Sequence, residues 1–443
     1  DLLETGDEKA VTCACYMGYI AWKAAPVLEE KLKQETMWNL FLNMEMPLIY
    51  SLYHMERAGI RVEKETLKAY GDKLKIKITQ LEQQIYEEAG ETFNINSPKQ
   101  LGEILFEKMQ LPHGKKTKTG YSTAVDVLER LAPIAPIVSK ILEYRQIAKI
   151  QSTYVIGLQD WVLEDGKIHT RYVQDLTQTG RLSSVDPNLQ NIPVRLEQGR
   201  LIRKAFVPEE ENSVLLSSDY SQIELRVLAH ISGDEHLIDA FKHGADIHTS
   251  TAMRVFNIEK PEDVTPNDRR NAKAVNFGVV YGISDFGLSN NLGISRKEAK
   301  AYIETYFERY PGIKDYMERV VREARDKGYV ETLFKRRREI PDINSRNFNI
   351  RGFAERTAIN SPIQGSAADI LKIAMIHLDE ALEAGAYKTK MLLQVHDEIV
   401  LQVPKEELTK IKQLVKETME SAIELAVPLE ADENEGQTWY EAK

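Results

Sequence analysis

The sequence has few of the features that mark secreted, membrane or metal-stapled proteins. It contains only two cysteines, Cys13 and Cys15, and their spacing fits neither a disulfide framework nor a zinc-ligand pattern. This scarcity favours a reducing, cytoplasmic setting. The longest uncharged apolar-rich stretch, residues 10–22, is shorter than the roughly 20 residues that a membrane-spanning helix needs. We therefore expect no membrane segment.

Basic charge is not in excess either. The 58 Lys and Arg residues are outnumbered by 68 Asp and Glu residues, which gives a formal net charge of −10. This balance excludes a uniformly basic nucleic-acid coat, so any polyanion must bind to local clusters. Cations gather at residues 200–204, 269–273, 335–338 and 115–118. They predict a positive channel on a negative body, with an affinity for polyanions that falls steeply with salt.

The length of 443 residues corresponds to about three domains. Apolar residues at 67–85 recur every three or four positions, which predicts a long amphipathic helix that ends at Gly90. Ser97 and Pro98 predict the start of another helix. Residues 111–123 have no apolar period and include three lysines, so they are either a basic loop tip or a solvated polar loop.

Two aspartates end β-rich runs. Asp219 follows the apolar run 214–218 and precedes a helical pattern, which places it at a strand-to-helix junction. Asp397 lies in His396-Asp397-Glu398 between two β-rich runs, so we expect a tight hairpin whose tip presents two adjacent carboxylates. Paired carboxylates commonly hold two divalent cations in phosphoryl transfer, and hard oxygen ligands favour Mg²⁺. A single Asp in such a turn is equally compatible with a turn-forming role.

A stripe of four side chains runs along the next helical segment. Arg269, Lys273, Phe277 and Tyr281 are four residues apart, so they span about 18 Å of one helix face, comparable to a nucleoside triphosphate. The cations lie toward the helix N-terminus, which favours anions, and the aromatics lie where a base could stack. The alternative is an ordinary amphipathic helix with its aromatics in the core and its cations in water.

Taken together, these segments resemble the polymerase portion of the family A DNA polymerases over nearly the whole chain. The three motifs that carry the resemblance are DYSQIELR at 219–226, RRNAKAVNFGVVYG at 269–282 and QVHDE at 394–398. Supporting blocks are TGRLSSVDPNLQNIP from Thr179, DIHTSTA from Asp246 and ERTAINSPIQGSAADI from Glu355.

The resemblance implies an α+β right-hand polymerase fold with an antiparallel palm sheet and a mainly helical thumb and fingers. The implied segments are the end of an exonuclease-like domain at 1–44, a thumb at 45–155, a first palm part at 156–231, fingers at 232–345 and a second palm part at 346–443. Because the proofreading carboxylates would lie upstream, we expect neither 3′→5′ exonuclease nor 5′ nuclease activity in this chain.

The activity implied is that of a DNA-directed DNA polymerase, a nucleotidyltransferase that acts in DNA replication and repair. It would add deoxynucleotides to a primer 3′-hydroxyl by two-metal-ion phosphoryl transfer and release pyrophosphate. The implied partners are primer-template DNA and deoxynucleoside triphosphates. The implied cofactor is a pair of Mg²⁺ ions, with Mn²⁺ able to substitute, and the implied form is a monomer associated with the nucleoid of a bacterial cell.

The resemblance also assigns individual residues. The implied metal ligands are Asp219, Asp397 and the Tyr220 carbonyl, with Glu398 in support and Lys273 as a candidate proton donor to pyrophosphate. The implied nucleotide-binding residues, among which Glu224 would exclude a ribose 2′-hydroxyl, are Arg269, Lys273, Phe277, Tyr281, Glu224, Gln222 and His248. The implied DNA-binding residues are Arg181, Asn188, Gln190, Asn191, Arg356, Asn360, Gln364 and His396.

Two alternatives remain open at this point. A single-subunit RNA polymerase shares the carboxylates and the stripe, and Glu224 argues against it. A binding-only relative would hold DNA without turnover, and the intact Asp219, Asp397 and Lys273 argue against that. The sequence departs from the family pattern at three places. Val185 stands where a hydroxyl residue is usual, and Lys335 stands where a Gly is usual. Residues 432–435 are more acidic than the corresponding stretch usually is.

Overall fold

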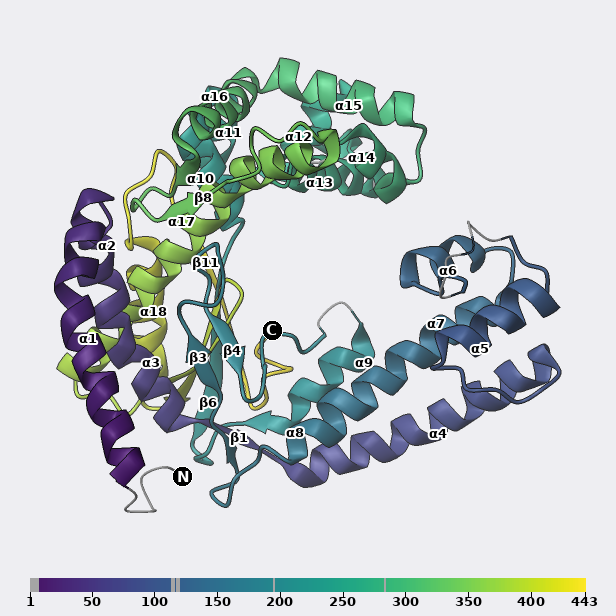
Figure 1. Ribbon diagram of the computed structural model, residues 1–443, viewed down its shortest axis with the longest axis horizontal. Helices are drawn as coiled ribbons and strands as arrows, with labels where there is room; N and C mark the ends of the chain where they lie inside the picture. Colours follow the sequence, from purple (N-terminus) through teal and green to yellow (C-terminus); the bar gives the residue numbers. More distant parts are fainter. Residues whose placement is uncertain (1–7, 113–115, 117–119, 194–195, 283) are drawn as a thin grey trace.

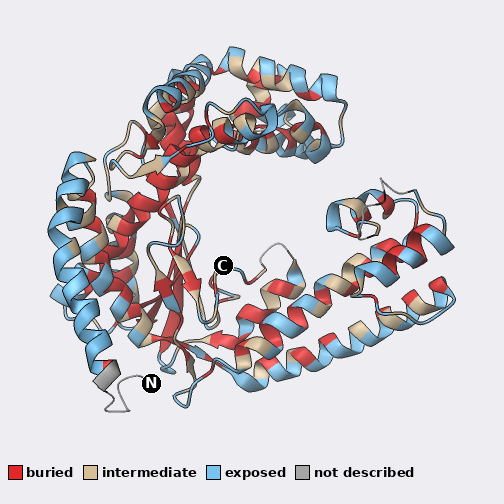
Figure 2. Cartoon of the chain, viewed as in Figure 1, coloured by how far each residue is buried: buried red, intermediate tan, exposed pale blue. Residues whose placement is uncertain are grey.

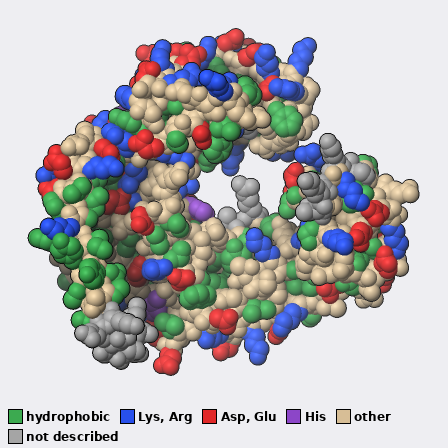
Figure 3. Space-filling view, viewed as in Figure 1, with side chains coloured by type: hydrophobic (Ala, Val, Ile, Leu, Met, Phe, Trp, Pro, Cys, Tyr) green, Lys and Arg blue, Asp and Glu red, His purple; other side chains and the backbone are tan. Residues whose placement is uncertain are grey.

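A four-stranded antiparallel sheet stands at the centre of the computed structural model, which describes residues 8–112, 116, 120–193, 196–282 and 284–443 (Figure 1). Its strand order is β11-β6-β10-β9. A helical lobe lies above the sheet, a helical arm extends from its lower end, and a wide opening separates the two (Figure 3). The sheet strands are β6 (Ser213–Tyr220), β9 (Lys390–Val395), β10 (Glu398–Pro404) and β11 (Ala431–Gly436).

The two central strands are buried on both faces. Leu216 and Leu401 belong to the core that includes the long helices behind the sheet, whereas Leu215 and Val400 belong to the core of the arm. This alternation follows from the two-residue period of a strand. Figure 2 shows the buried band running without a break from the sheet into the helices behind it. Packing from both sides therefore holds the strand ends that carry Asp219 and Asp397.

The arm contains the first predicted helices. The predicted helix at 67–85 is α4 (Lys64–Ala89), and Gly90 ends it in a left-handed conformation. Ser97 caps α5 (Pro98–Gly102) by accepting a hydrogen bond from the Gln100 amide, as predicted. Of the three lysines at 111–123, Lys115 and Lys118 lie outside the described residues, and Lys116 pairs with Glu107 at 2.8 Å.

Short helices and edge strands complete the arm and its base. They are β1 (Ile60–Val62), η2 (Glu103–Lys108), α6 (Val125–Leu131), α7 (Pro136–Lys149), η3 (Ile150–Ile156), α8 (Gly157–Gln159), β2 (Lys167–Ile168), β3 (Arg171–Val173), β4 (Ser183–Val185), α9 (Glu197–Arg200), η4 (Leu201–Ala205) and β5 (Phe206–Val207).

The upper lobe is helical and begins directly after β6. Its helix α13 carries the predicted stripe and lies on the side of the lobe that faces the opening (Figure 1). The helices of the lobe are α10 (Ile223–Ser232), α11 (Glu235–Lys242), α12 (Ile247–Phe256), η5 (Pro261–Asp263), α13 (Pro266–Val280), α14 (Asp285–Leu292), α15 (Arg296–Arg309) and α16 (Pro311–Lys327).

Long helices cover the back of the sheet. The predicted helix after the carboxylate hairpin is α18 (Leu408–Glu420), which packs against β6, β10 and β11. None of the helices within the described ranges is long and apolar enough to cross a membrane. The other elements on this side are α1 (Glu8–Gln34), α2 (Trp38–Leu40), η1 (Phe41–Glu45), α3 (Met46–Ala58) and α17 (Phe348–Ala384).

A tight hairpin at the base of the lobe contains one of the departures from the family pattern. Lys335 lies in the turn between β7 (Tyr329–Glu331) and β8 (Arg337–Glu339), and its φ is +67°. Only glycine adopts this left-handed region without steric cost, which gives a physical reason for the usual Gly there. Within the described ranges, the one ion pair of the exposed Lys335 side chain is with Glu331 at 3.7 Å.

We predict that Lys335→Gly raises the free energy of unfolding by about 0.5–1 kcal/mol, because relief of the left-handed strain outweighs the larger entropy of the unfolded chain and the loss of an exposed ion pair. Urea unfolding measures the change. Lys300→Gly is the matched control: Lys300 makes a comparable exposed pair with Glu304 inside α15, where glycine should lower stability by about 1 kcal/mol. Destabilisation by both substitutions would contradict the strain at Lys335.

Candidate active site

The predicted carboxylates meet at one end of the central sheet. In the β6–β10 pair Asp219 lies opposite Glu398, and the Tyr220 amide donates to the Asp397 carbonyl at 3.2 Å. The predicted hairpin is therefore confirmed, and it places Asp397 beside the end of β6. The antiparallel register alone brings together residues that are nearly 180 positions apart in the sequence.

The prediction that the hairpin tip presents both carboxylates is wrong for Glu398. Its side chain is fully buried, because Glu398 is the first residue of β10 and points into the layer between the sheet and the arm. Its Oε1 accepts hydrogen bonds from Ser217 Oγ at 2.7 Å and from Trp439 Nε1 at 3.1 Å. Asp397 is 28% exposed and Asp219 is 42% exposed, so these two remain accessible.

The two accessible aspartates lie close to other carboxylates, and a bound cation would reduce the repulsion between their negative charges. Burial raises the pKa of Asp219, and Glu398 and Asp397 raise it further against the opposing effect of Lys443. Burial also raises the pKa of Asp397, which Arg181 partly offsets. Within the described part of the chain, no three acidic, His or Cys side chains already form a metal cage. Asp219 and Asp397 nonetheless supply hard oxygen donors, and the Lys443 ammonium that contacts Asp219 shows that a cation fits there.

The stripe on α13 points away from the core. Its cations are exposed, Phe277 is half-buried and Tyr281 is 47% exposed, whereas Val275 and Val279 on the other face are buried. The alternative of aromatics packed into the core is therefore wrong. A groove of about 900 Å³ runs along the stripe and is lined by Arg270, Lys273, Ala274, Phe277, Gly278, Tyr281, Ser284, Gly287, Asn291 and Arg356.

Two residues of α12 stand behind the cationic end of the stripe. Asp246 caps α12 and accepts from Arg269, with one contact at 2.7 Å, and these interactions outweigh burial and lower the pKa of Asp246 to about 2. His248 is 2% exposed, and its Nδ1 accepts from Asn276 Nδ2 at 3.1 Å. Its proton is therefore on Nε2, which is buried and has no partner among the residues that the structure describes. Burial lowers the pKa of His248 to about 4.

A chain of side-chain contacts joins the stripe to the carboxylates. Tyr281 Oη donates to Glu224 Oε2 at 3.2 Å, and Arg181 donates to Glu224 Oε1 at 2.8 Å. The same guanidinium lies 3.8 Å from Asp397 Oδ1. Glu224 is thus held from two sides between α13 and the hairpin. This juxtaposition of residues from three distant segments was not accessible from their spacing in the sequence.

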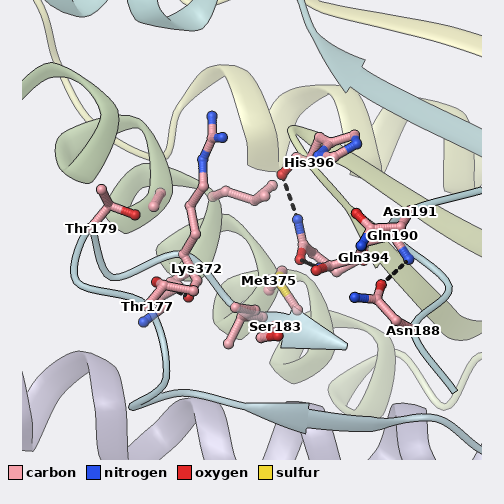
Figure 4. Close-up of a pocket in the computed structure, with 14 residues that line it drawn as sticks. Thr177, Thr179, Ser183, Asn188, Gln190, Asn191, Lys372, Met375, Gln394 and His396 are labelled. Carbon is pink, nitrogen blue, oxygen red and sulfur yellow. Dashed lines mark hydrogen bonds between the residues drawn. The ribbon is translucent and has the colours of Figure 1, made fainter. Parts of the chain in front are cut away.

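A polar cavity of about 280 Å³ collects most of the predicted DNA-binding residues (Figure 4). Gln190 Nε2 donates to Gln394 Oε1 at 2.9 Å, and Gln394 Nε2 donates to the His396 carbonyl at 2.5 Å. Burial lowers the pKa of His396, so its ring favours the neutral form. The predicted residues that line the cavity are Arg181, Asn188, Gln190, Asn191 and His396.

The remaining predicted residues lie nearby but outside this cavity. Arg356 is exposed and lines the groove of the stripe, and Asn360 Nδ2 donates to the Val280 carbonyl at 3.3 Å. Gln364 is half-buried four residues further along α17. Gln222 adopts a left-handed conformation (φ +55°) at the start of α10, and its Oε1 is buried with no partner in the described part of the chain.

Sequence reasoning missed several residues of the site. Gln394 lies within a motif that the sequence identified, so only its role was missed. Lys372 lines the polar cavity, but it is almost fully buried because it pairs with Glu45 at 2.7 Å. Lys443 contacts Asp219 and Glu398, and no local pattern marks it.

For two arginines the predicted place in a positive channel is wrong. Arg203 is 3% exposed, and its guanidinium stacks on the Trp439 ring at 4.0 Å. Arg336 is half-buried and lies between Asp369 and Glu45, which it pairs with. Each of these cations joins elements of the fold, because a buried charge needs a partner close by. The exposed Arg269, Arg270 and Lys273 agree with the prediction.

A family model for DNA polymerase family A matches residues 64–441, which is most of the chain. The chain belongs to DNA polymerase family A. DNA polymerase I of Streptococcus pneumoniae (strain TIGR4) is 78% identical over 432 residues, which cover 97% of this chain and 49% of that protein. DNA polymerase I of Lactococcus lactis (strain IL1403) is 74% identical over 425 residues, which cover 95% of this chain and 48% of that protein.

A solved structure supports the same family. The polymerase domain of Pol1 from M. smegmatis, in complex with DNA primer-template and dNTP, matches with a TM-score of 0.91 and 42% identity, over 95% of this chain and 74% of that chain. The neighbour has the right-hand polymerase fold, which confirms the predicted fold class. The chain spans about half the length of the curated relatives it matches.

The buried His248 leads to a prediction on stability. The unfolded chain takes up a proton near pH 6.5 and the folded chain only near pH 4, so this site lowers the free energy of unfolding as the pH falls through that window. The glutamine in His248→Gln does not titrate. The free energy of unfolding of this variant, relative to the parent, should therefore rise as the pH falls from about 7 to about 5. Urea unfolding at both pH values measures this, with the exposed His243→Gln as control. A pH-independent difference would contradict the buried neutral ring.

Proposed function

We propose that this chain catalyses template-directed DNA synthesis, adding deoxynucleotides to a primer 3′-hydroxyl with release of pyrophosphate, as part of DNA replication and repair. The observation that carries the proposal is the contact chain Tyr281–Glu224–Arg181–Asp397, which joins a nucleotide-sized cationic and aromatic stripe to a carboxylate pair. Membership of DNA polymerase family A supports it.

The stripe provides the features that a bound nucleoside triphosphate needs. Arg269 and Lys273 would bind the phosphates at the N-terminal half of α13, with the buried Nε2–H of His248 behind them. Phe277 and Tyr281 would pack against the sugar and base at the other end. Lys273 has no carboxylate partner among the described residues and lies 5.9 Å from the Phe277 ring. Its free ammonium would donate a proton to the leaving pyrophosphate.

The carboxylate end would perform the phosphoryl transfer. Asp219 and Asp397, with the Tyr220 carbonyl, would hold two Mg²⁺ ions, and Mn²⁺ would substitute for them. When bound, the metal ions lower the pKa of the attacking hydroxyl and stabilise the charge of the leaving group. Glu398 would support the two metal-binding aspartates by adding negative charge close to them. It is buried and hydrogen-bonded to Ser217 and Trp439, so it would not itself bind metal.

The polar cavity would contact the DNA. Its amide and arginine donors can reach minor-groove acceptors that all correctly formed base pairs share, so they would test pair geometry without reading sequence. Arg356, Asn360 and Gln364 would extend this surface toward the templating base. We propose residues 45–155 as thumb, 156–231 and 346–443 as palm and 232–345 as fingers, with the duplex in the opening between arm and lobe (Figure 3).

Primer extension with a single-turnover readout tests this function. Asp397→Asn should lower the rate of nucleotide addition by about 100-fold to 1,000-fold, because it removes a charged metal ligand while keeping the shape of the side chain. Asp239→Asn on the exposed face of α11 is the matched control and should extend at the parental rate. Parental extension by Asp397→Asn would overturn the proposal.

The same samples test the proposed lack of nuclease activity. The purified parent chain should release no mononucleotides from single-stranded or nicked duplex DNA in the presence of Mg²⁺. Release that persists in Asp397→Asn would show a second active site in these residues. A binding-only protein would instead retain DNA without any Mg²⁺-dependent extension.

Glu224 distinguishes the proposal from an RNA polymerase. Its side chain is 8% exposed and held by Arg181 and Tyr281, so it cannot easily move away from an added 2′-hydroxyl. Glu224→Ala should raise the ratio of ribonucleotide to deoxyribonucleotide incorporation by at least about tenfold, since it removes a rigid steric block. Competing kinetics on one primed template measure the ratio. Glu235→Ala, exposed on α11, is the control, and an unchanged ratio in Glu224→Ala would contradict the role.

A further inference from the structure

The last residues of the sequence are packed firmly against the palm sheet. Trp439 is fully buried, its amide donates to the Phe206 carbonyl at 3.0 Å, and its ring meets the Phe206 ring edge-on with 5.4 Å between centroids. Arg203 stacks on the same indole at 4.0 Å. Ala442 is also fully buried. This anchoring brings the chain end marked C beside the central sheet (Figure 1).

The anchored segment delivers an ammonium group to the metal-binding end of the sheet. Lys443 Nζ lies 3.3 Å from Asp219 Oδ2 and forms a close ion pair with Glu398 Oε2. Glu398 is thereby satisfied on both oxygens, because Ser217 and Trp439 donate to Oε1. Among the described residues, the contact with Lys443 is the one hydrogen bond that the Asp219 side chain accepts from another side chain. Lys443 thus occupies one of the two Asp219 oxygens that are available to a metal.

The other cations near the carboxylates cannot play the same part. Arg181 contacts Asp397 at 3.8 Å and is also bound to Glu224. Arg203 is buried behind the Trp439 ring. Two like charges cannot share one carboxylate oxygen at contact distance without strong repulsion. A divalent cation at Asp219 and the Lys443 ammonium at the same oxygen are therefore mutually exclusive.

We propose that Lys443 is a positioning residue that acts as an internal counter-cation of Asp219 in the metal-free chain and leaves Asp219 when a divalent cation binds. Its competition sets the concentration of metal at which the site fills. Because Glu398 stays paired with Lys443, the metal is directed to Asp219 and Asp397. This inference rests on the proposed metal site at these two aspartates.

Binding of Mn²⁺ to the full chain, without DNA or nucleotide, tests the competition. The loss of the electron paramagnetic resonance signal of free Mn²⁺ gives the affinity directly and needs no catalytic activity. Lys443→Met keeps the aliphatic stem and removes the charge, so it should bind the first Mn²⁺ at least about fivefold more tightly than the parent. Lys443→Arg keeps the charge and should stay within about twofold of the parent.

Matched variants make the outcome specific. Lys416→Met removes an exposed lysine charge from α18, where it pairs with Glu420 at 3.9 Å, and should leave the affinity unchanged. Equal affinity in Lys443→Met and the parent would overturn the inference, and so would the same gain in Lys416→Met. Asp219→Asn should lose the tight Mn²⁺ site; if it binds as the parent does, the proposed metal site itself is wrong, whatever Lys443 does.

Thermal unfolding provides a second readout in case Lys443→Met folds less well. In metal-free buffer this variant should unfold at a lower temperature than the parent, because Asp219 and Glu398 lose their counter-charge. Saturating Mn²⁺ should narrow that difference, since the metal then supplies at Asp219 the positive charge that Lys443 supplied there, while Glu398 still lacks its partner in the variant. A difference that Mn²⁺ leaves unchanged would assign Lys443 a structural role only and would overturn the competition.

Discussion

The antiparallel pairing of β6 with β10 is the constraint on which the rest of the site depends. It places Asp219 opposite Glu398 and the end of β6 beside Asp397, and packing on both faces of the sheet prevents these strands from shifting. A shift of one residue would exchange the buried and accessible carboxylates. The strand register therefore causes negative charge to accumulate at this end of the sheet. The surrounding cations lie close enough to offset part of that charge.

The distribution of charge is compatible with the proposed anionic partner despite a net charge of −10. Some cations form ion pairs inside the fold, as Arg336 does with Glu45 and Asp369. Others stay exposed on α13 or reach the carboxylates, as Arg181 does. Acidic residues such as Asp432 lie on the edge strand β11. Local potential, which depends on these positions, matters more to binding than the sum of charges.

Much of the local structure could be predicted because short-range physics decides it. The helix at 67–85, the Ser97 cap and the carboxylate hairpin follow from apolar spacing, capping and β-propensity. The family motifs likewise identified Asp219, Asp397 and the α13 stripe. The burial of Glu398 and Arg203 could not be predicted, because neither depends on its neighbours in sequence. Both are decided by Trp439, which is far away in the chain.

The sequence by itself determined the helix that carries cations and aromatics in one stripe, because periodicity and residue chemistry are local properties. Its motifs implied the class of fold through their resemblance to a known family. Only the tertiary structure decided which charged side chains face the opening and which form ion pairs inside the fold. It also decided that Tyr281 and Arg181 hold Glu224 between them. It also brought Lys443 to Asp219 and Glu398. Such contacts arise when distant segments pack together, and no spacing along the chain encodes them.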